Sequence, residues 1–227
     1  MSEIEKHERV HDMLLGPLER PTLQWLAARM PAWMHPDILT LIGVGGSILT
    51  FVGYWLTNLD PIYLWLASLG FVINWFGDSL DGTLARFRKM ERPHFGFFVD
   101  HTVDSFSMVI VFVGMGLSPF VRMEIALVAC IGYLGMSILS YVGAFVSGQF
   151  KISYSKIGPT EARLVVIGIN TWIFFAGNPT LDLGLISTTV FDFLIMIIAA
   201  IELFLFISNT TRQALYWRAV DEGKNLK

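Results

Sequence analysis

Four aspartates fall in two pairs whose spacing is suited to metal binding. Asp78 and Asp81 stand three residues apart at the end of one apolar run, and Asp100 and Asp104 stand four apart at the start of the next. Residues three or four apart share a face of an α-helix. The connection between the two runs is short, which makes the two helices antiparallel neighbours. All four carboxylates are therefore expected at one depth in the fold.

Such a cluster needs cations. Carboxylates at the edge of hydrocarbon either change their protonation or find a positive partner. Carboxylate oxygens suit the hard ions Mg²⁺, Mn²⁺ or Ca²⁺ rather than Zn²⁺, which prefers the cysteine and histidine ligands that are scarce in this chain. We expect two divalent cations, because a pair about 3.5–4 Å apart can hold the oxygens of a displacement at phosphorus. The pattern indicates phosphate chemistry.

Small residues accompany the aspartates. Gly82 follows the second aspartate, Ala85 keeps the same face small, and Gly96 precedes the third by four residues. A bulky side chain at these positions would block a ligand, although small residues are equally typical of packing between membrane helices. Arg86 can bind a phosphate oxygen through its planar guanidinium.

The elements that carry these residues are predicted to be membrane helices. The 227-residue chain is 54% hydrophobic and 15% charged, with a mean hydropathy of +0.57. An α-helix needs roughly 20 apolar residues to cross a bilayer. Six stretches approach that length, and we expect an all-α integral membrane protein with six transmembrane helices. The predicted spans are approximately 39–57, 62–80, 98–117, 123–147, 164–177 and 183–207.

The charges between the spans predict the orientation. Of the 16 lysine and arginine residues, all except Arg122 fall in segments on one side of the six-span arrangement. Cytoplasmic loops carry this excess, so both termini and the aspartates are expected at the cytoplasmic surface. Residues 1–35 mix apolar and charged residues and contain Pro17 and Pro21, which predicts short amphipathic helices on the membrane surface. Residues 36–227 then form one transmembrane domain.

Written as one pattern, D78-x2-D81-G82-x2-A85-R86-x9-G96-x3-D100-x3-D104, the motif resembles the signature of the CDP-alcohol phosphotransferase family. The resemblance implies transfer of a substituted phosphate group from a CDP-linked donor to an alcohol, with release of CMP. It also implies Asp78, Asp81 and Asp100 as metal ligands and Asp104 as a ligand, the general base, or both. The nucleotide contacts implied by the resemblance are Gly82, Ala85, Arg86 and, with them, Gly96.

A second family feature is a PNxxT start to the first span, which occurs here as PDILT. Thr40 keeps its place near the expected ligand, whereas Asp37 replaces the usual asparagine. The alternative for Asp37 is a helix N-cap after Pro36.

Details of the motif favour one of two subclasses by resemblance. The stretch FVDHTVDSFS is similar to choline and ethanolamine phosphotransferases, and so is the pair Thr160 and Glu161. His101 is then expected as a base near a lipid hydroxyl such as that of diacylglycerol, with Glu161 fixing its tautomer. The alternative is phosphatidyl transfer from CDP-diacylglycerol to a soluble alcohol (glycerol phosphate, inositol phosphate or serine), for which Arg163 could bind an acceptor phosphate. The resemblance also implies a homodimer.

The sequence assigns no catalytic role to the other polar residues in the spans. Asn74 shares the face of Asp78 and is expected to line the cavity. Asp192 and Glu202 have no partner that the sequence identifies, and Cys130, the only cysteine, is expected to be a buried thiol. A cation transporter is a remote alternative, since the aspartates lie near one surface rather than along a path. The net charge of −3 predicts no nucleic-acid partner.

Overall fold

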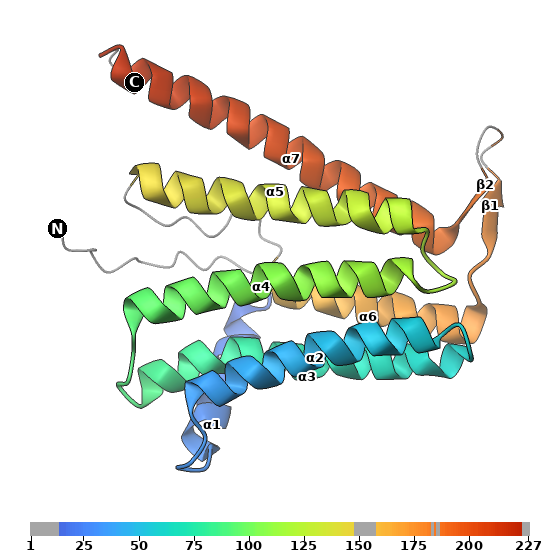
Figure 1. Cartoon of the computed structure of the whole chain (residues 1–227), viewed down its shortest axis with the longest axis horizontal. Helices are drawn as coiled ribbons and strands as arrows, with labels where there is room; N and C mark the ends of the chain where they lie inside the picture. The colour runs from blue at the N-terminus through green and yellow to red at the C-terminus, as the bar shows by residue number, and fades with distance from the viewer. Residues whose placement is uncertain (1–13, 148–157, 183, 185–186, 224–227) are drawn as a thin grey trace.

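The computed structural model describes residues 14–147, 158–182, 184 and 187–223 (Figure 1). The predicted all-α character is confirmed, with one small hairpin added. The helices are α1 (Gly16–Arg29), α2 (Pro36–Leu56), α3 (Leu64–Phe87), α4 (Pro93–Gly116), α5 (Met123–Ser147), α6 (Pro159–Ala176) and α7 (Val190–Asp221), with a 3₁₀ turn η1 (Pro61–Tyr63) before α3. Strands β1 (Thr180–Asp182) and β2 (Ser187–Thr189) pair antiparallel between α6 and α7.

Within these described ranges, four helices are long and apolar enough to cross a membrane: α2, α4, α5 and α7. The other two predicted spans, 62–80 and 164–177, are also helical, as α3 and α6. Both helices include charged residues that lower their mean hydropathy: Asp78, Asp81 and Arg86 in α3, and Glu161 and Arg163 in α6.

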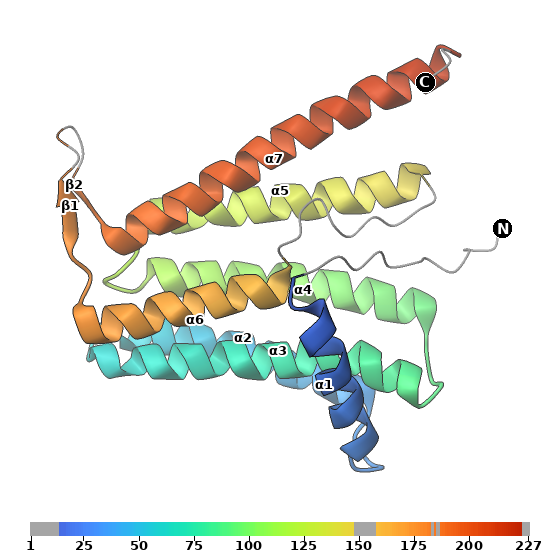
Figure 2. The same cartoon turned by 180° about the vertical axis from the view of Figure 1, so that it is seen from behind.

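The helices pack in a bundle built outward from the pair α2 and α3. Helix α4 lies against α2, α5 against α4, and α7 against α5, while α6 covers the other side of α3. Successive helices from α2 to α7 run in alternating directions (Figure 1). Helix α1 crosses α3 at the end of the bundle opposite the hairpin (Figure 2). The main core gathers apolar side chains from this bundle, among them Tyr54, Phe71, Phe112 and Phe191.

Helices α2 and α3 meet backbone to backbone through glycines. A Cβ atom added at Gly46 would lie 2.3 Å from the backbone N of Asn74, and one added at Gly77 would lie 2.3 Å from the backbone N of Gly43. Small residues permit this approach in membrane proteins. The contact fixes α2 close enough to α3 for their polar side chains to form one site.

The last predicted span begins later than expected. Residues 187–189 form a strand instead of helix, and α7 begins at Val190, with Thr189 as its N-cap accepting from the backbone N–H of Asp192. Asp192 has a partner that the sequence did not identify: it accepts from the backbone N–H of Arg122 at 2.8 Å and lies 3.4 Å from the Arg122 guanidinium. This pair ties the start of α7 to the start of α5.

Helix α1 differs from the predicted short helices in being continuous through Pro21. Its Leu23 and Ala27 side chains are buried against Leu80 and Leu84 of α3. Leu18 and Trp25 are exposed on the helix. The prediction of amphipathic helices also covers residues 1–13, which lie outside the described part of the chain.

Candidate active site

The turn between α3 and α4 brings the two aspartate pairs together. Helix α3 ends at Phe87, after which Lys89 adopts a left-handed conformation with φ 55°. Its N–H donates to the carbonyl of Arg86, and the N–H of Met90 donates to that of Ala85. These bonds form a Schellman motif with lysine at the position where glycine is usual. Pro93 is the first residue of α4. Proline is favourable there because N–H groups in the first turn of a helix have no acceptor within the helix.

Three of the four aspartates converge. One carboxylate oxygen each from Asp78, Asp100 and Asp104 lies within 4.8 Å of the others. Asp81 lines the same cleft, but its carboxylate accepts from Thr40 Oγ1 at 2.6 Å and from the backbone N–H of Gly82. The expected convergence across α3 and α4 is thus present, with Asp81 directed toward α2.

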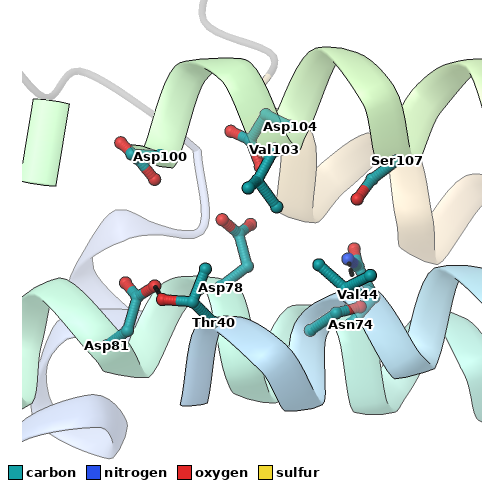
Figure 3. A pocket seen from close by; sticks show the side chains of 10 residues that line it. Thr40, Val44, Asn74, Asp78, Asp81, Asp100, Val103, Asp104 and Ser107 are labelled. Carbon is teal, nitrogen blue, oxygen red and sulfur yellow. Dashed lines mark hydrogen bonds between the residues drawn. The ribbon is translucent and has the colours of Figure 1, made fainter. Parts of the chain in front are cut away.

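These side chains line a cleft of about 230 Å³, counting its open mouth (Figure 3). Asp81 and Thr40 lie at one end, Ser107 and Asn74 at the other, and Asp78 and Asp104 between them (Figure 3). The Asn74 amide nitrogen donates to the Gly43 carbonyl and to Ser47 Oγ, both at 3.0 Å. Asn74 therefore lines the cavity as expected and also fastens α3 to α2.

Arg163 of α6 supplies positive charge to the cluster. Its Nη2 lies 2.6 Å from Asp78 Oδ2, and the two side chains are only 14% and 19% exposed. A shielded, charge-assisted pair of this kind is stronger than a surface ion pair. The sequence did not predict this contact, because residue 163 is far along the chain and only the packing of α6 on α3 brings it to the cleft.

The three converging carboxylates fit a hard divalent cation. Oxygens bound to one Mg²⁺ at about 2.1 Å lie at most about 4.2 Å apart, so a group within 4.8 Å needs only small side-chain adjustments. The donor set is entirely oxygen, as Mg²⁺ and Mn²⁺ prefer. Asp81 stands at the edge of the same cleft as a further oxygen donor.

His101 lies beside the acidic group in an aromatic setting. Its ring stacks on Tyr141 with centroids 4.9 Å apart and meets Phe97 edge-on at 4.2 Å. His101 Nδ1 is 3.7 Å from Asp100 Oδ2. The imidazole is thus next to one of the three converging carboxylates.

Glu161 lies at the contact between α6 and α1. Its carboxylate accepts from the backbone N–H of Leu15 at 2.8 Å and from that of Gly158 at 2.9 Å. Partial burial raises the pKa of Glu161, but these backbone donors outweigh it and hold the pKa below its ordinary value. The contacts of this carboxylate fasten α1 to the start of α6, two residues before Arg163.

A second carboxylate strengthens the same contact. Glu19 Oε1 of α1 accepts from Trp75 Nε1 at 2.7 Å and from Thr160 Oγ1 at 2.8 Å. Arg88, just after α3, donates to the carbonyls of Met30 and Pro31 at the other end of α1. Helix α1 is therefore held against α6 at its start and against α3 along its length.

Most of the expected nucleotide contacts lie in the last turns of α3 and the first turn of α4. Arg86 is exposed, and its Nη2 donates to Thr83 Oγ1. A Cβ added at Gly82 would meet nothing closer than the Arg86 guanidinium at 3.4 Å, and one at Gly96 would meet nothing within 4 Å. Ala85 is half-buried. Space for a ligand therefore remains above these small residues.

Asp37 is not the N-cap of α2. The N-cap is His35, whose Nδ1 accepts from the Asp37 backbone N–H, and Pro36 occupies the first turn. The Asp37 carboxylate instead pairs with Arg92 at the start of α4. This ion pair joins the start of α2 to the start of α4.

The sequence model for the CDP-alcohol phosphatidyltransferase family matches residues 33–207. The chain belongs to this family. The matched region contains the whole acidic cleft, Arg163 and the helices from α2 into α7. The family assignment made from the spaced aspartates is confirmed.

Proteins similar to this chain include two named cholinephosphotransferase 1. The protein of Gallus gallus is 28% identical over 181 residues, covering 74% of this chain and 52% of that protein. The protein of Homo sapiens is 27% identical over 177 residues, covering 73% and 43%. An uncharacterized protein of Aquifex aeolicus is 37% identical over 79 residues, covering 33% and 40%. The chain thus spans about half the length of the cholinephosphotransferases it matches.

Proposed function

We propose that this protein is a membrane-bound, divalent-cation-dependent CDP-alcohol phosphotransferase of phospholipid synthesis. The proposed reaction moves phosphocholine or phosphoethanolamine from its CDP derivative to the hydroxyl of a lipid alcohol such as diacylglycerol and releases CMP. The observation that carries the proposal is the meeting of Asp78, Asp100 and Asp104 in one cleft. The similarity to cholinephosphotransferases supports the choice of donor.

Asp78, Asp100 and Asp104 would hold Mg²⁺ or Mn²⁺, with Asp81 as a fourth ligand for a second ion. Bound there, the cations would neutralise the diphosphate of the donor and the charge of the departing CMP. Thr40, Gly82, Ala85, Arg86 and, with them, Gly96 would bind the nucleotide. The place of Thr40 in the lining of the cleft and the free space beside Gly82 and Gly96 support this role.

The residues of the chain account for the proton. The acceptor oxygen forms a bond to phosphorus, the bond from that phosphorus to the CMP oxygen breaks, and CMP leaves with the electron pair. The hydroxyl proton passes to a carboxylate, for which Asp104 is proposed because it lies between the two ends of the cleft. His101, beside Asp100, is proposed as a second proton acceptor. Glu161 would orient the start of α6, which carries Arg163, through its contacts with α1 and Gly158.

Six transmembrane helices with cytoplasmic termini are part of the proposal. The alternating directions of α2 to α7 support six spans (Figure 1). The distribution of lysine and arginine supports a cleft on the cytoplasmic side. Helix α1 would lie at that surface with Leu18 and Trp25 toward the lipid. We further propose a homodimer, by resemblance to the family.

The alternative is phosphatidyl transfer from CDP-diacylglycerol to a water-soluble alcohol. Arg163 favours it, because a guanidinium at the cleft can bind the phosphate of an acceptor such as glycerol phosphate. The experiment that separates the two supplies purified protein and Mn²⁺ with each donor in turn. CMP formed from CDP-choline and diacylglycerol supports the first reaction, and CMP formed only from CDP-diacylglycerol and a soluble alcohol supports the second.

The metal site has its own test. Asp78→Asn and Asp100→Asn are expected to lose turnover by several orders of magnitude and to weaken Mn²⁺ binding measured by calorimetry. Asp221→Asn, at an exposed position in the last turn of α7, is the matched control for loss of one carboxylate charge. Normal rates and normal Mn²⁺ affinity in the two cleft variants would refute the ligand assignment.

A further inference from the structure

Ser107 has a buried hydroxyl without a hydrogen-bond partner. The residue is 4% exposed, and no described residue lies within hydrogen-bond reach of its Oγ. Other hydroxyls on the helices behave differently: Ser105 donates to the carbonyl of His101 and Thr83 to that of Ser79. Buried hydroxyls in folded proteins are almost always paired. The Ser107 hydroxyl lines the acidic cleft, so its partner would enter through that cleft.

The position of Ser107 is specific within the cleft. It follows Asp104 by three residues, which places it on the same face of α4 and about 4.5 Å farther from the start of the helix. Figure 3 shows it with Asn74 at the end opposite Asp81 and Thr40. The Asn74 amide nitrogen is already engaged by α2. The Ser107 hydroxyl is therefore the group at this end that has a hydrogen bond to offer.

The geometry of transfer at phosphorus assigns an occupant to this end. Attacking and leaving oxygens lie on opposite sides of the phosphorus, roughly in line. The nucleotide is proposed at the end of the cleft that Thr40 and Asp81 line, so the acceptor oxygen must arrive from the opposite end. That end lies deeper in the bundle, along α4 and away from its first turn.

Resting on the proposed function, we infer that Ser107 binds the hydroxyl of the acceptor alcohol and positions it for attack. Its Oγ–H donates to a lone pair of the acceptor oxygen. The acceptor's own proton is then left to point toward Asp104, one turn away. Ser107 thereby selects acceptors that present an alcohol oxygen at the deep end, whether the alcohol is a lipid or a soluble molecule.

The test compares Ser107→Ala with Ser140→Ala. Ser140 lies on α5, and its hydroxyl donates to the Met136 carbonyl, so its loss matches the chemical change at a paired position. With CDP-choline and dioctanoylglycerol in detergent micelles, Ser107→Ala is expected to raise the KM for dioctanoylglycerol about 3- to 10-fold. In Ser107→Ala the KM for CDP-choline and the Mn²⁺ affinity should stay within about twofold of wild type. In Ser140→Ala all three quantities should stay within about twofold of wild type. A parallel experiment uses CDP-diacylglycerol and glycerol 3-phosphate. A raised KM for glycerol 3-phosphate with an unchanged KM for CDP-diacylglycerol identifies a soluble acceptor.

A binding measurement keeps the inference separate from turnover. Dioctanoylglycerol or glycerol 3-phosphate is added to Mn²⁺-loaded protein, and the rise in its thermal midpoint is compared between wild type and Ser107→Ala. A smaller rise in the variant supports the inference, even where no donor yields CMP and the proposed function fails. An unchanged acceptor KM and an unchanged rise mean that Ser107 binds an ordered water only, which overturns the inference. Parallel losses of acceptor, donor and Mn²⁺ affinity mean a structural role and overturn it as well, as does a protein that responds to neither acceptor.

Discussion

The contact of α2 with α3 makes a sharp prediction at Gly46. A Cβ at this position would lie 2.3 Å from the backbone N of Asn74 and 2.8 Å from both its Cα and the Gly70 carbonyl oxygen. All three atoms belong to the backbone, so no side-chain rotation relieves the overlap. Gly46→Ala must therefore separate the two helices by about 1 Å to restore ordinary contact.

The magnitude follows from what that separation disrupts. Overpacking of a fitted contact costs about 1–3 kcal/mol. The two bonds from the Asn74 amide, both 3.0 Å long, would also stretch beyond hydrogen-bond reach, at about 1 kcal/mol or more for a buried amide. Alanine returns about 1 kcal/mol through its helix propensity. A net loss of about 1–3 kcal/mol lowers the thermal midpoint by about 2–12 °C in a chain of this size.

Gly45→Ala is the matched control, because a Cβ at Gly45 meets nothing within 4 Å. It should keep or raise the midpoint, since only the propensity gain applies. The assay is thermal unfolding of both variants in detergent, with Mn²⁺ affinity as a second reading, because the separation also moves Thr40 away from Asp81. Equal midpoints for the two variants would refute the backbone-contact argument.

Three further predictions concern charges around the bundle. Arg163→Gln should destabilise the metal-free protein, because Asp78 loses its counter-charge, and Mn²⁺ should then raise the thermal midpoint more than in wild type. Asp192→Asn should lower the free energy of unfolding by about 1–3 kcal/mol, seen as a lower thermal midpoint. Arg122→Gln should lower it by less, because the Asp192 side chain is 3% exposed and that of Arg122 is 54%. Glu161 has a lowered pKa, so its contribution is present above its ordinary pKa of 4.5 and is lost as the pH falls through the lower folded value. Acid titration followed by limited proteolysis should show α1 released in that range, and Glu161→Gln should remove this step; a wild-type protein whose α1 stays protected throughout would contradict it.

The acidic centre was predictable from the sequence because it depends on local spacing. Intervals of three and four residues put Asp78 on the face of Asp81 and Asp100 on that of Asp104, and a short turn brings the two faces together. The direction of Asp81 was not predictable in the same way. Its carboxylate bonds to Thr40 because α2 approaches α3 through glycines, and nothing in the spacing within α3 records that approach.

Partners distant in the sequence account for the other differences. Arg163 reaches Asp78, and Asp192 reaches Arg122, only after the helices have packed. Single residues of this kind fit several roles when read alone, as Arg163 does for a phosphate ligand, a counter-charge or a topological signal. The start of α7 was misplaced for a related reason, since the apolar run from residue 183 continues through a strand whose pairing with β1 is not local to the helix pattern.

The glycines show how the structure separates two roles that the sequence leaves joined. Small residues beside the aspartates are equally consistent with helix packing and with space for a ligand. At Gly46 and Gly77 a side chain would overlap backbone, so packing accounts for the glycine. At Gly82 and Gly96 a Cβ would meet no backbone of the described chain within 3.4 Å, and packing gives no reason for it. Gly82, next to Asp81, and Gly96, one turn before Asp100, therefore leave space that the proposed nucleotide needs.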